Sequence, residues 1–258
     1  MAWRYEIRSG IGLFVAGGLA AAGVNAAASG RSGGASRVPF DSLNLSRGAG
    51  DEEPAVLENR RRLGDAIGVA WPALSTVRQV HGTEVWRVTG PGAQDRDADA
   101  LIAQGPGAAL AILVADCAPV FLWDPAHRAI GLAHAGWRGT AGRIATRTVA
   151  AMAAAFGSHP ADLLAAVGPA IGPCCYEVDE PVLRAAIWPQ GVIRPGRPDH
   201  AYLDVPGANA RFLQEAGVPA DRIEVAGVCT MCAQDRLFSH RGSGGRTGRM
   251  AAVLALPG

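Results

Sequence analysis

Residues 101–134 read LIAQGPGAALAILVADCAPVFLWDPAHRAIGLAH. The stretch contains four short apolar segments separated by turn residues, and they cover 101–103, 109–115, 120–123 and 129–133. Short apolar runs bounded by Gly, Pro and Asp are typical of successive buried β-strands. We therefore predict a run of strands at the centre of the chain, with Asp116, Cys117 and His134 standing where strands end.

Helical periodicity flanks this run on both sides. The segment 53–67 places Val56, Leu63 and Ile67 on one face, and 140–156 carries apolar residues at helical spacing behind Thr140, a residue type that caps helices. Further helices are expected at 181–187 and 205–216, and further strands at 164–167, 223–228, 250–256, and as a pair at 74–80 and 84–88. No regular strand–helix alternation, Walker loop or Rossmann fingerprint is found. The pattern alone predicts a mixed α and β protein.

Composition excludes several classes of partner. Among 258 residues, 49% are apolar, and 24 Lys and Arg against 23 Asp and Glu give a net charge of +1. No basic patch stands out, so a nucleic-acid partner is not expected, and no segment is apolar for long enough to span a bilayer. Five cysteines without the spacing of a disulfide scaffold favour a reducing compartment, here the cytoplasm.

The first 28 residues allow two interpretations. Arg4 and Arg8 precede an apolar stretch over 10–24 and small residues over 25–28, which is the outline of a secretory signal. The apolar stretch is rich in Gly and poor in Leu, and it can instead form a pair of strands. We prefer the strands.

His81, Cys117 and His134 each follow an apolar, strand-like run, although they lie far apart in the sequence. Strands that end together at one edge of a sheet would bring the three side chains together. Two imidazoles and one thiolate suit zinc, and a set of three protein ligands leaves the fourth position open, as in catalytic zinc sites. The alternative is ordinary packing, because a free Cys often fills a core and a single His is more often a hydrogen-bonded residue than a ligand.

Two other polar features are expected to be structural. Cys229 and Cys232 have the spacing of half a zinc knuckle, with His240 nearby, but the other half is missing and structural thiols are preferred. The adjacent Cys174 and Cys175 are not expected to chelate one ion or to pair with each other without strain. The loop Asp95–Asp99 is expected to be a solvated surface turn.

The segments that hold the three predicted ligands resemble the signature segments of the YfiH/YlmD family: Gln79-Val-His81-Gly, Ala115-Asp-Cys117-Ala-Pro and His134-Ala-Gly-Trp-Arg-Gly139-Thr. Further blocks resemble the family at 40–46 with 58–61, at 168–177 and at 229–249, so that the likeness covers about residues 35–254 in order. The resemblance implies a single α+β domain over residues 1–258, with two packed mixed β-sheets and flanking helices. The first 30 or so residues are the part that the resemblance covers least.

The same resemblance implies a purine nucleoside enzyme with one zinc ion per chain and with nucleoside and phosphate as its small-molecule partners. The implied reactions are phosphorolysis of adenosine, inosine, guanosine or methylthioadenosine, and deamination of adenosine by a zinc-activated water. Arg60 is the predicted phosphate ligand because a guanidinium matches phosphate in a bidentate manner, with Arg138 ranked below it. Asp116 is the predicted acid/base or ligand-orienting group, and Asn44 a predicted substrate contact.

Other functions remain open at this stage. The family has also been labelled polyphenol oxidase or multicopper laccase, but six histidines without a His-x-His pair do not supply a multicopper centre, so copper is not expected. Cys117 could instead be a nucleophile with a histidine base. Peptidoglycan editing, the removal of a misplaced L-Ser from a cell-wall precursor, fits either chemistry. A purely structural zinc module is disfavoured, because such a site normally has four protein ligands.

Overall fold

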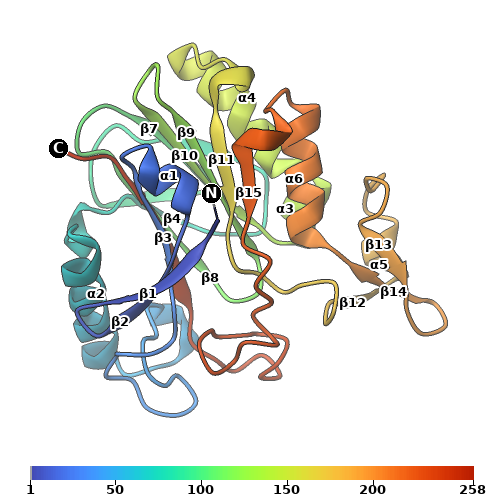
Figure 1. Cartoon of the computed structure of the whole chain (residues 1–258). Coiled ribbons are helices and arrows are strands. Elements are labelled where there is room, and N and C mark those ends of the chain that lie inside the picture. Colours follow the sequence, from blue (N-terminus) through green and yellow to red (C-terminus); the bar gives the residue numbers. More distant parts are fainter. Residues whose placement is uncertain (1) are drawn as a thin grey trace.

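The computed structural model describes residues 2–258, and its largest feature is a pair of β-sheets packed face to face (Figure 1). The first sheet is antiparallel throughout, with the strand order β1-β2-β3-β16-β8. Its strands are β1 (Arg4–Arg8), β2 (Ile11–Val15), β3 (Asn25–Ser29), β8 (Ala109–Val114) and β16 (Met250–Ala255). The residues of the disputed N-terminal stretch thus form three successive strands, the third of which pairs with β16, the last strand of the chain.

The second sheet has the order β15-β11-β9-β10-β7-β5 and is mixed, because its two outermost pairs are parallel and its central pairs antiparallel. Its strands are β5 (Val85–Arg87), β7 (Ala100–Gln104), β9 (Ala118–Asp124), β10 (Ala129–Ala135), β11 (Leu164–Val167) and β15 (Ile223–Val225). Strands β8 and β9 are consecutive in sequence but belong to different sheets. The short connection between them, which contains Asp116 and Cys117, therefore crosses from one sheet to the other.

Within residues 2–258, two small sheets and six α-helices complete the fold. Strands β12 (Glu177–Asp179), β13 (Ile193–Pro195) and β14 (His200–Leu203) form one small sheet that projects from the body with α5, and β4 (Thr76–Arg78) pairs with β6 (Ala93–Asp97) in the other (Figure 1). The helices are α1 (Gly17–Ala21), α2 (Glu53–Ile67), α3 (Trp137–Ala141), α4 (Ile144–Phe156), α5 (Glu180–Leu183) and α6 (Val205–Glu215).

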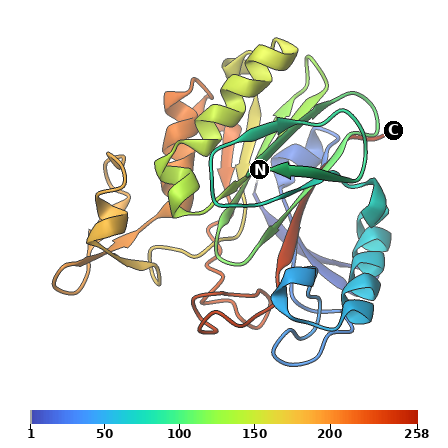
Figure 2. The same ribbon diagram turned by 180° about the vertical axis from the view of Figure 1, so that it is seen from behind.

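The body has four layers: α2, the first sheet, the second sheet, and α4 with α6. Side chains on a strand alternate between its two faces, so each sheet packs against a neighbouring layer on both sides. Phe121 and Leu132 of the second sheet meet Phe14 of the first in the core between the sheets. The intervening residues Val120 and Leu122 pack instead under α4 and α6. Helix α2 covers the outer face of the first sheet, and Figure 2 shows it on the opposite side of the molecule from α4 and α6.

Helix α2 spans the predicted residues 53–67. Pro54 stands in its first turn, where a missing N–H costs nothing, and Gly68 ends it in a left-handed conformation with φ 72°. Val56, Leu63 and Ile67 are buried, as the helical spacing predicts. The loop that follows α2 leads into β4 and toward the site described below.

The fold class is confirmed, and two local expectations are corrected. The segments 74–80 and 84–88 do not pair with each other: β4 pairs with β6, and β5 pairs with β7. Thr140 caps no helix; it lies inside α3, and Arg143 in a left-handed conformation (φ 64°) separates α3 from α4. Among residues 2–258, no helix has both the length and the apolar character needed to cross a bilayer.

Candidate metal centre and its cavity

The structure brings His81, Cys117 and His134 together, with one ligand atom from each lying within 4.8 Å of the others. His134 is the penultimate residue of β10, Cys117 lies in the crossing from β8 to β9, and His81 follows β4. The imidazole rings of His81 and His134 meet edge to face, with centroids 4.9 Å apart. The strands that precede or hold these residues, β4, β8 and β10, belong to three different sheets. The predicted convergence therefore occurs where the sheets meet and not along the edge of one sheet.

Asp99 fixes the geometry of this triad. Its carboxylate is completely buried and accepts a hydrogen bond from Nδ1 of His134 at 2.8 Å. It also accepts from the backbone N–H groups of Val80, His81 and Gly82, at 3.2, 3.0 and 2.6 Å. His81 adopts φ 59°, which turns these successive N–H groups toward one anion. The expectation of a solvated turn at Asp99 is therefore wrong, because the loop around His81 folds over it.

The hydrogen bond to Asp99 decides which nitrogen of His134 can bind a metal. A carboxylate only accepts, so Nδ1 carries a proton, and Nε2 is the nitrogen that can lose its proton and bind an ion. Burial alone would raise the pKa of Asp99, but hydrogen bonds from His134 and the Gly82 amide outweigh burial and lower it. The carboxylate therefore stays charged beside the histidine.

The same arrangement prepares the Cys117 thiol. Burial would raise its pKa, but hydrogen bonds from His134 and His81 outweigh burial and lower the pKa to about 6. Burial would lower the pKa of His134, and its contacts with Asp99 and Cys117 raise it to about 9 instead. At neutral pH the metal-free triad thus holds a thiolate, the form that binds metals.

Gly136 supplies the space in which the triad fits. A Cβ atom at this position would lie 2.9 Å from Sγ of Cys117 and 3.3 Å from Cδ2 of His81. Gly136 is one of the small residues that follow His134 in the sequence, and side chains of the triad approach it this closely because it has no Cβ. The donor set, the spacing of the ligand atoms and this cradle fit a metal ion with three protein ligands.

The triad lines a cavity of about 650 Å³ that is rich in arginine. Arg138, Arg241 and Arg249 line it, and among residues 2–258 none of the three forms an ion pair with a carboxylate. Arg138 stacks on Trp137 with Cζ 4.2 Å from the ring centroid, and Arg241 lies 5.0 Å from that of Tyr176. Unpaired guanidinium groups beside the triad favour an anionic ligand.

Asp116 also lines the cavity, where it adopts φ 83° between the two sheets. One oxygen accepts from Oγ1 of Thr230 at 2.5 Å, and the other accepts from the backbone N–H of Arg241 at 2.6 Å. These contacts attach the Cys117 crossing to the C-terminal loop that carries two of the cavity arginines.

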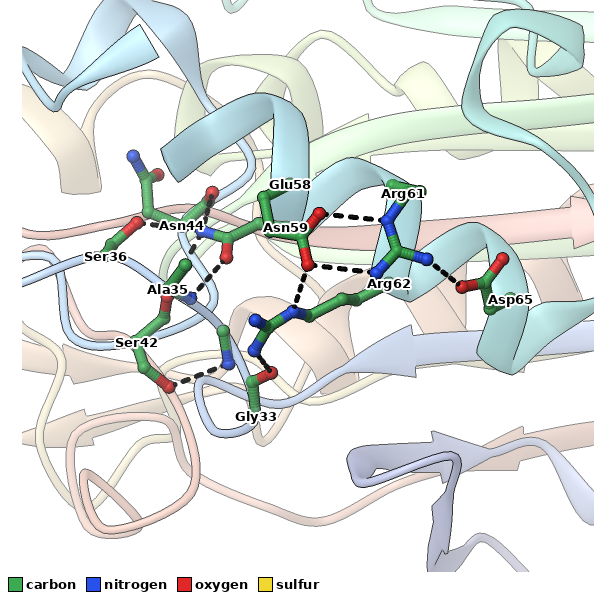
Figure 3. A network of polar contacts seen from close by, with 11 residues as sticks. Gly33, Ala35, Ser36, Ser42, Asn44, Glu58, Asn59, Arg61, Arg62 and Asp65 are labelled. Carbon is green, nitrogen blue, oxygen red and sulfur yellow. Dashed lines mark hydrogen bonds and ion pairs between the residues drawn. The ribbon is translucent and has the colours of Figure 1, made fainter. Parts of the chain in front are cut away.

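Asn44, for which the sequence predicts a substrate contact, is fully buried and does not line the cavity. Its Oδ1 accepts from the backbone N–H groups of Ser46 and Arg249, at 3.1 and 2.9 Å, and both of these residues line the cavity. Its loop is held against α2 by Asn59, whose Nδ2 donates to the carbonyl of Asn44 at 2.8 Å (Figure 3). Asn44 thus acts on the site through the backbone of its neighbours.

Arg60, the predicted phosphate ligand, lines a different cavity, of about 600 Å³, which adjoins the first at Val77, Gln79 and Leu113. Its Nε and Nη2 donate to the carbonyl of Leu45 at 2.9 and 2.8 Å, and its Cζ lies 4.5 Å from the ring centroid of Trp71. Burial lowers its pKa to about 10, with Arg47 contributing. Arg138 and Arg249 are therefore nearer to the triad than the residue that sequence reasoning ranked first.

The other four cysteines lie outside the lining of both cavities. Their Sγ atoms all lie within 4.8 Å of one another, and they are Cys174, Cys175, Cys229 and Cys232. The adjacent pair, which is not expected from the sequence to chelate one ion, thus lies in a set of four possible ligands. Sequence reasoning missed the set because it is assembled from two loops.

The four-layered sandwich thus carries a His₂Cys triad that could bind a metal ion, in a cavity lined by arginines. The family model described as "Multi-copper polyphenol oxidoreductase laccase" matches residues 25–257. Purine nucleoside phosphorylase of Deinococcus radiodurans is 43% identical over 230 residues, covering 88% of this chain and 87% of the relative. Purine nucleoside phosphorylase YlmD of Geobacillus stearothermophilus is 40% identical over 247 residues, covering 90% of each.

The crystal structure of YlmD from the same Geobacillus species superposes with a TM-score of 0.91, at 35% identity and 99% coverage of both chains. The chain belongs to this family of YfiH and YlmD proteins.

Proposed function

We propose that the protein is a zinc-dependent purine nucleoside phosphorylase. The observation that carries the proposal is the presence of an open His₂Cys triad and three unpaired arginines in one cavity. The names of the relatives, which share 40% and 43% of their residues with this chain, support the same activity. Phosphorolysis needs a place for a nucleoside, a place for phosphate and a proton for the departing base, and the cavity offers groups for each.

His81, Cys117 and His134 would hold the ion. When bound, zinc supplies a Lewis acid at the open position beside the substrate. Zinc is favoured over a set of copper ions because a multicopper oxidase needs many histidines. In the described part of the chain, residues 2–258, only two groups of three or more possible ligands occur, and together they hold two histidines. The description of the family model as an oxidoreductase is therefore not carried over to this chain.

Arg249 is the foremost candidate for binding phosphate. Its Nη1 donates to the carbonyls of Thr247 and Gly248, at 2.9 and 3.1 Å, which fixes the side chain and leaves other guanidinium donors available. Burial lowers its pKa, although nearby Cys117 and Asp116 raise it. The guanidinium stays charged at neutral pH, and it can contact two phosphate oxygens in a bidentate manner.

The reaction would proceed with phosphate held by the arginines next to the ribose. A phosphate oxygen forms a bond to C1′ of the ribose, the C1′–N9 bond breaks, and its electron pair leaves with the purine, which then takes up a proton. Ile171, Leu113 and Val205 offer apolar walls for the base. Burial raises the pKa of the Tyr176 phenol to about 12, so the hydroxyl stays protonated and can only donate to or accept from substrate as a neutral group.

Asp116 is proposed to move a proton or to keep the Cys117 crossing in position, as the sequence predicts. Its two hydrogen bonds to the C-terminal loop support the positioning role. Deamination of adenosine would use the same centre with water in place of phosphate, and the open coordination position supports it. Adenosine, inosine, guanosine and methylthioadenosine remain proposed substrates, while peptidoglycan editing would need a seryl peptide in the same cavity.

Two variants test the proposal. Cys117→Ala should lose most of the metal and most of the activity while the far-UV circular dichroism spectrum is unchanged. Arg249→Ala should raise the KM for phosphate with a much smaller effect on the KM for inosine. Arg60→Ala is the matched control, because Arg60 lies in the adjoining cavity and is predicted from sequence to bind phosphate. A larger phosphate effect in Arg60→Ala than in Arg249→Ala would overturn the assignment of Arg249.

A further inference from the structure

Four of the five cysteines form a compact cluster that the proposed reaction does not use. Sγ of Cys232 lies 3.4 Å from Sγ of Cys175 and 3.6 Å from Sγ of Cys174, and all four sulfurs lie within 4.8 Å of one another. Cys174 and Cys232 are exposed, and Cys175 and Cys229 are half-buried. The cluster is therefore close to solvent, from which an ion could enter.

Two backbone loops present the sulfurs to a common point. The segment 168–172 runs beside 228–230, where Thr230 N donates to the carbonyl of Ala170 at 3.1 Å. A tight turn, closed by Cys175 N donating to the carbonyl of Gly172 at 3.0 Å, carries Cys174 and Cys175. A second turn, closed by Ala233 N donating to the carbonyl of Cys229 at 3.0 Å, carries Cys229 and Cys232.

The spacing of the sulfurs fits one ion in a tetrahedron of thiolates. A zinc–sulfur bond of about 2.3 Å places neighbouring sulfurs of such a tetrahedron at about 3.8 Å. The two sulfur–sulfur distances of 3.4 and 3.6 Å from Cys232 are close to this value. An iron–sulfur cluster would place several irons and sulfides between the thiolates, which would push the sulfurs farther apart than this set allows.

A pair of disulfides explains the arrangement less well. All five cysteines are free, and Cys232 lies at almost the same distance from two different partners, whereas a disulfide joins one pair at about 2.0 Å. The backbone N–H of Gly172 also donates to Sγ of Cys229 at 3.2 Å, and such a bond stabilises a thiolate.

We propose that Cys174, Cys175, Cys229 and Cys232 bind a second, structural zinc ion. A site with four protein ligands has no open position, so this ion would have no part in catalysis. The sequence predicts one zinc ion per chain; this proposal raises the number to two. It rests on the cluster alone and does not depend on the proposed phosphorolysis.

The second ion would stabilise one wall of the cavity. It would join the loop that carries Ile171 and Tyr176 to the loop that carries His240 and Arg241, all four of which line the cavity. The second loop also contains Thr230, which donates to Asp116. Loss of this ion should therefore loosen the wall while the ligands of the first ion remain in place.

Elemental analysis of protein purified under reducing conditions without chelator tests the proposal. The wild-type chain should contain two zinc ions, and the Cys117→Ser variant one. Cobalt added to metal-free Cys117→Ser should give the intense thiolate-to-cobalt charge-transfer and tetrahedral absorption of a four-thiolate site. The Cys232→Ser variant should also contain one zinc ion, which the triad retains.

Several results would overturn the proposal. One is a wild-type chain with a single zinc ion that is lost completely in Cys117→Ser. Another is a denatured, unreduced wild-type chain with fewer than five titratable thiols, which would indicate disulfides in the cluster. Iron in place of zinc would overturn the identity of the ion. If Cys232→Ser fails to fold, the cobalt spectrum of Cys117→Ser still decides between a four-thiolate site and none.

Discussion

Replacement of Asp99 by Asn should weaken zinc binding although Asp99 is not a ligand. The side chain keeps its shape but loses its charge and one of its two acceptor oxygens. Each oxygen of Asp99 accepts two hydrogen bonds: Oδ1 from His81 N and His134 Nδ1, and Oδ2 from Val80 N and Gly82 N. Whichever way the new amide turns, its NH₂ group faces two groups that now donate to a carboxylate.

Both orientations of the amide in Asp99→Asn carry a cost. With NH₂ in the Oδ2 position, the N–H groups of Val80 and Gly82 lose their acceptor. A fully buried unsatisfied donor costs about 1–3 kcal/mol, and the cost here is smaller because Val80 is exposed and Gly82 is half-buried. With NH₂ in the Oδ1 position, His134 can accept on Nδ1 only if its proton moves to Nε2, the nitrogen that the ion needs. Loss of a carboxylate partner of a ligating histidine typically lowers metal affinity about 10–100-fold, equivalent to about 1.4–2.7 kcal/mol.

The assay is competition for zinc between the purified protein and a chromogenic chelator, together with urea denaturation of the metal-free protein. Asp95→Asn is the matched control, because Asp95 lies in β6, the strand that leads to Asp99, and is exposed. We expect Asp99→Asn to bind zinc at least tenfold more weakly and to unfold at lower urea, with Asp95→Asn unchanged. Wild-type affinity and wild-type stability in Asp99→Asn would refute the role assigned to this carboxylate.

Three further predictions concern the same cavity. Gly136→Ala should lose most of the zinc and keep its secondary structure, because its Cβ would lie 2.9 Å from Sγ of Cys117. Gly90→Ala is the control, because nothing lies within 4 Å of a Cβ at that position. Full zinc content in Gly136→Ala would contradict the role of Gly136 in making space for the triad. In metal-free protein, the pKa of about 6 for Cys117 predicts that its alkylation by iodoacetamide rises through pH 6 and is constant above it, whereas a midpoint near 8.5 would indicate an ordinary thiol. If Asp116 moves a proton, Asp116→Asn should lower turnover by about 10²–10⁴-fold with zinc retained. If Asp116 only positions Cys117, the variant should bind zinc more weakly, with a smaller effect on turnover. Unchanged turnover and zinc content would exclude both roles.

The convergence of the three triad residues could be predicted because each has a local signal in the sequence. His81, Cys117 and His134 follow apolar runs of strand length, and strands converge at their ends. The sequence around Asp99 indicates a solvent-exposed turn instead of a buried site, because four of the five residues from Asp95 to Asp99 are charged. Its burial depends on the loop at His81 folding over it, which is a tertiary contact. The one local clue was its position directly before the apolar strand 100–104.

The placement of the arginines and of the four clustered cysteines likewise depends on tertiary contacts that the local sequence does not show. The sequence predicts Arg60 as the phosphate ligand because a guanidinium matches phosphate in a bidentate manner, but the face of α2 on which it lies borders the adjoining cavity. Arg249 lies near the end of the chain, and only the pairing of β16 beside β8 brings it next to Asp116 and Cys117. For the cysteines, spacing along the chain indicates half of a site, and the partner half comes from a loop more than 50 residues earlier.

The break between α3 and α4 has a local cause that the apolar periodicity of the sequence does not predict. The apolar spacing over 140–156 continues through the break, so a single helix fits the pattern. Gly142 and Arg143 interrupt it, and a Cβ at Gly142 would lie 2.4 Å from Cγ2 of Thr83, close to the loop that carries His81. Arg143, with φ 64°, ends the helical conformation, and Gly142 allows the chain to pass close to the loop of His81.

The most direct test of the central claim is the product profile of the zinc-loaded wild-type enzyme with inosine, measured with and without phosphate. The account predicts hypoxanthine and ribose 1-phosphate in equal amounts, formation of both only when phosphate is present, and loss of both in Cys117→Ala. Hypoxanthine formed at the same rate without phosphate, or full activity in metal-free protein, would contradict a zinc-dependent phosphorylase.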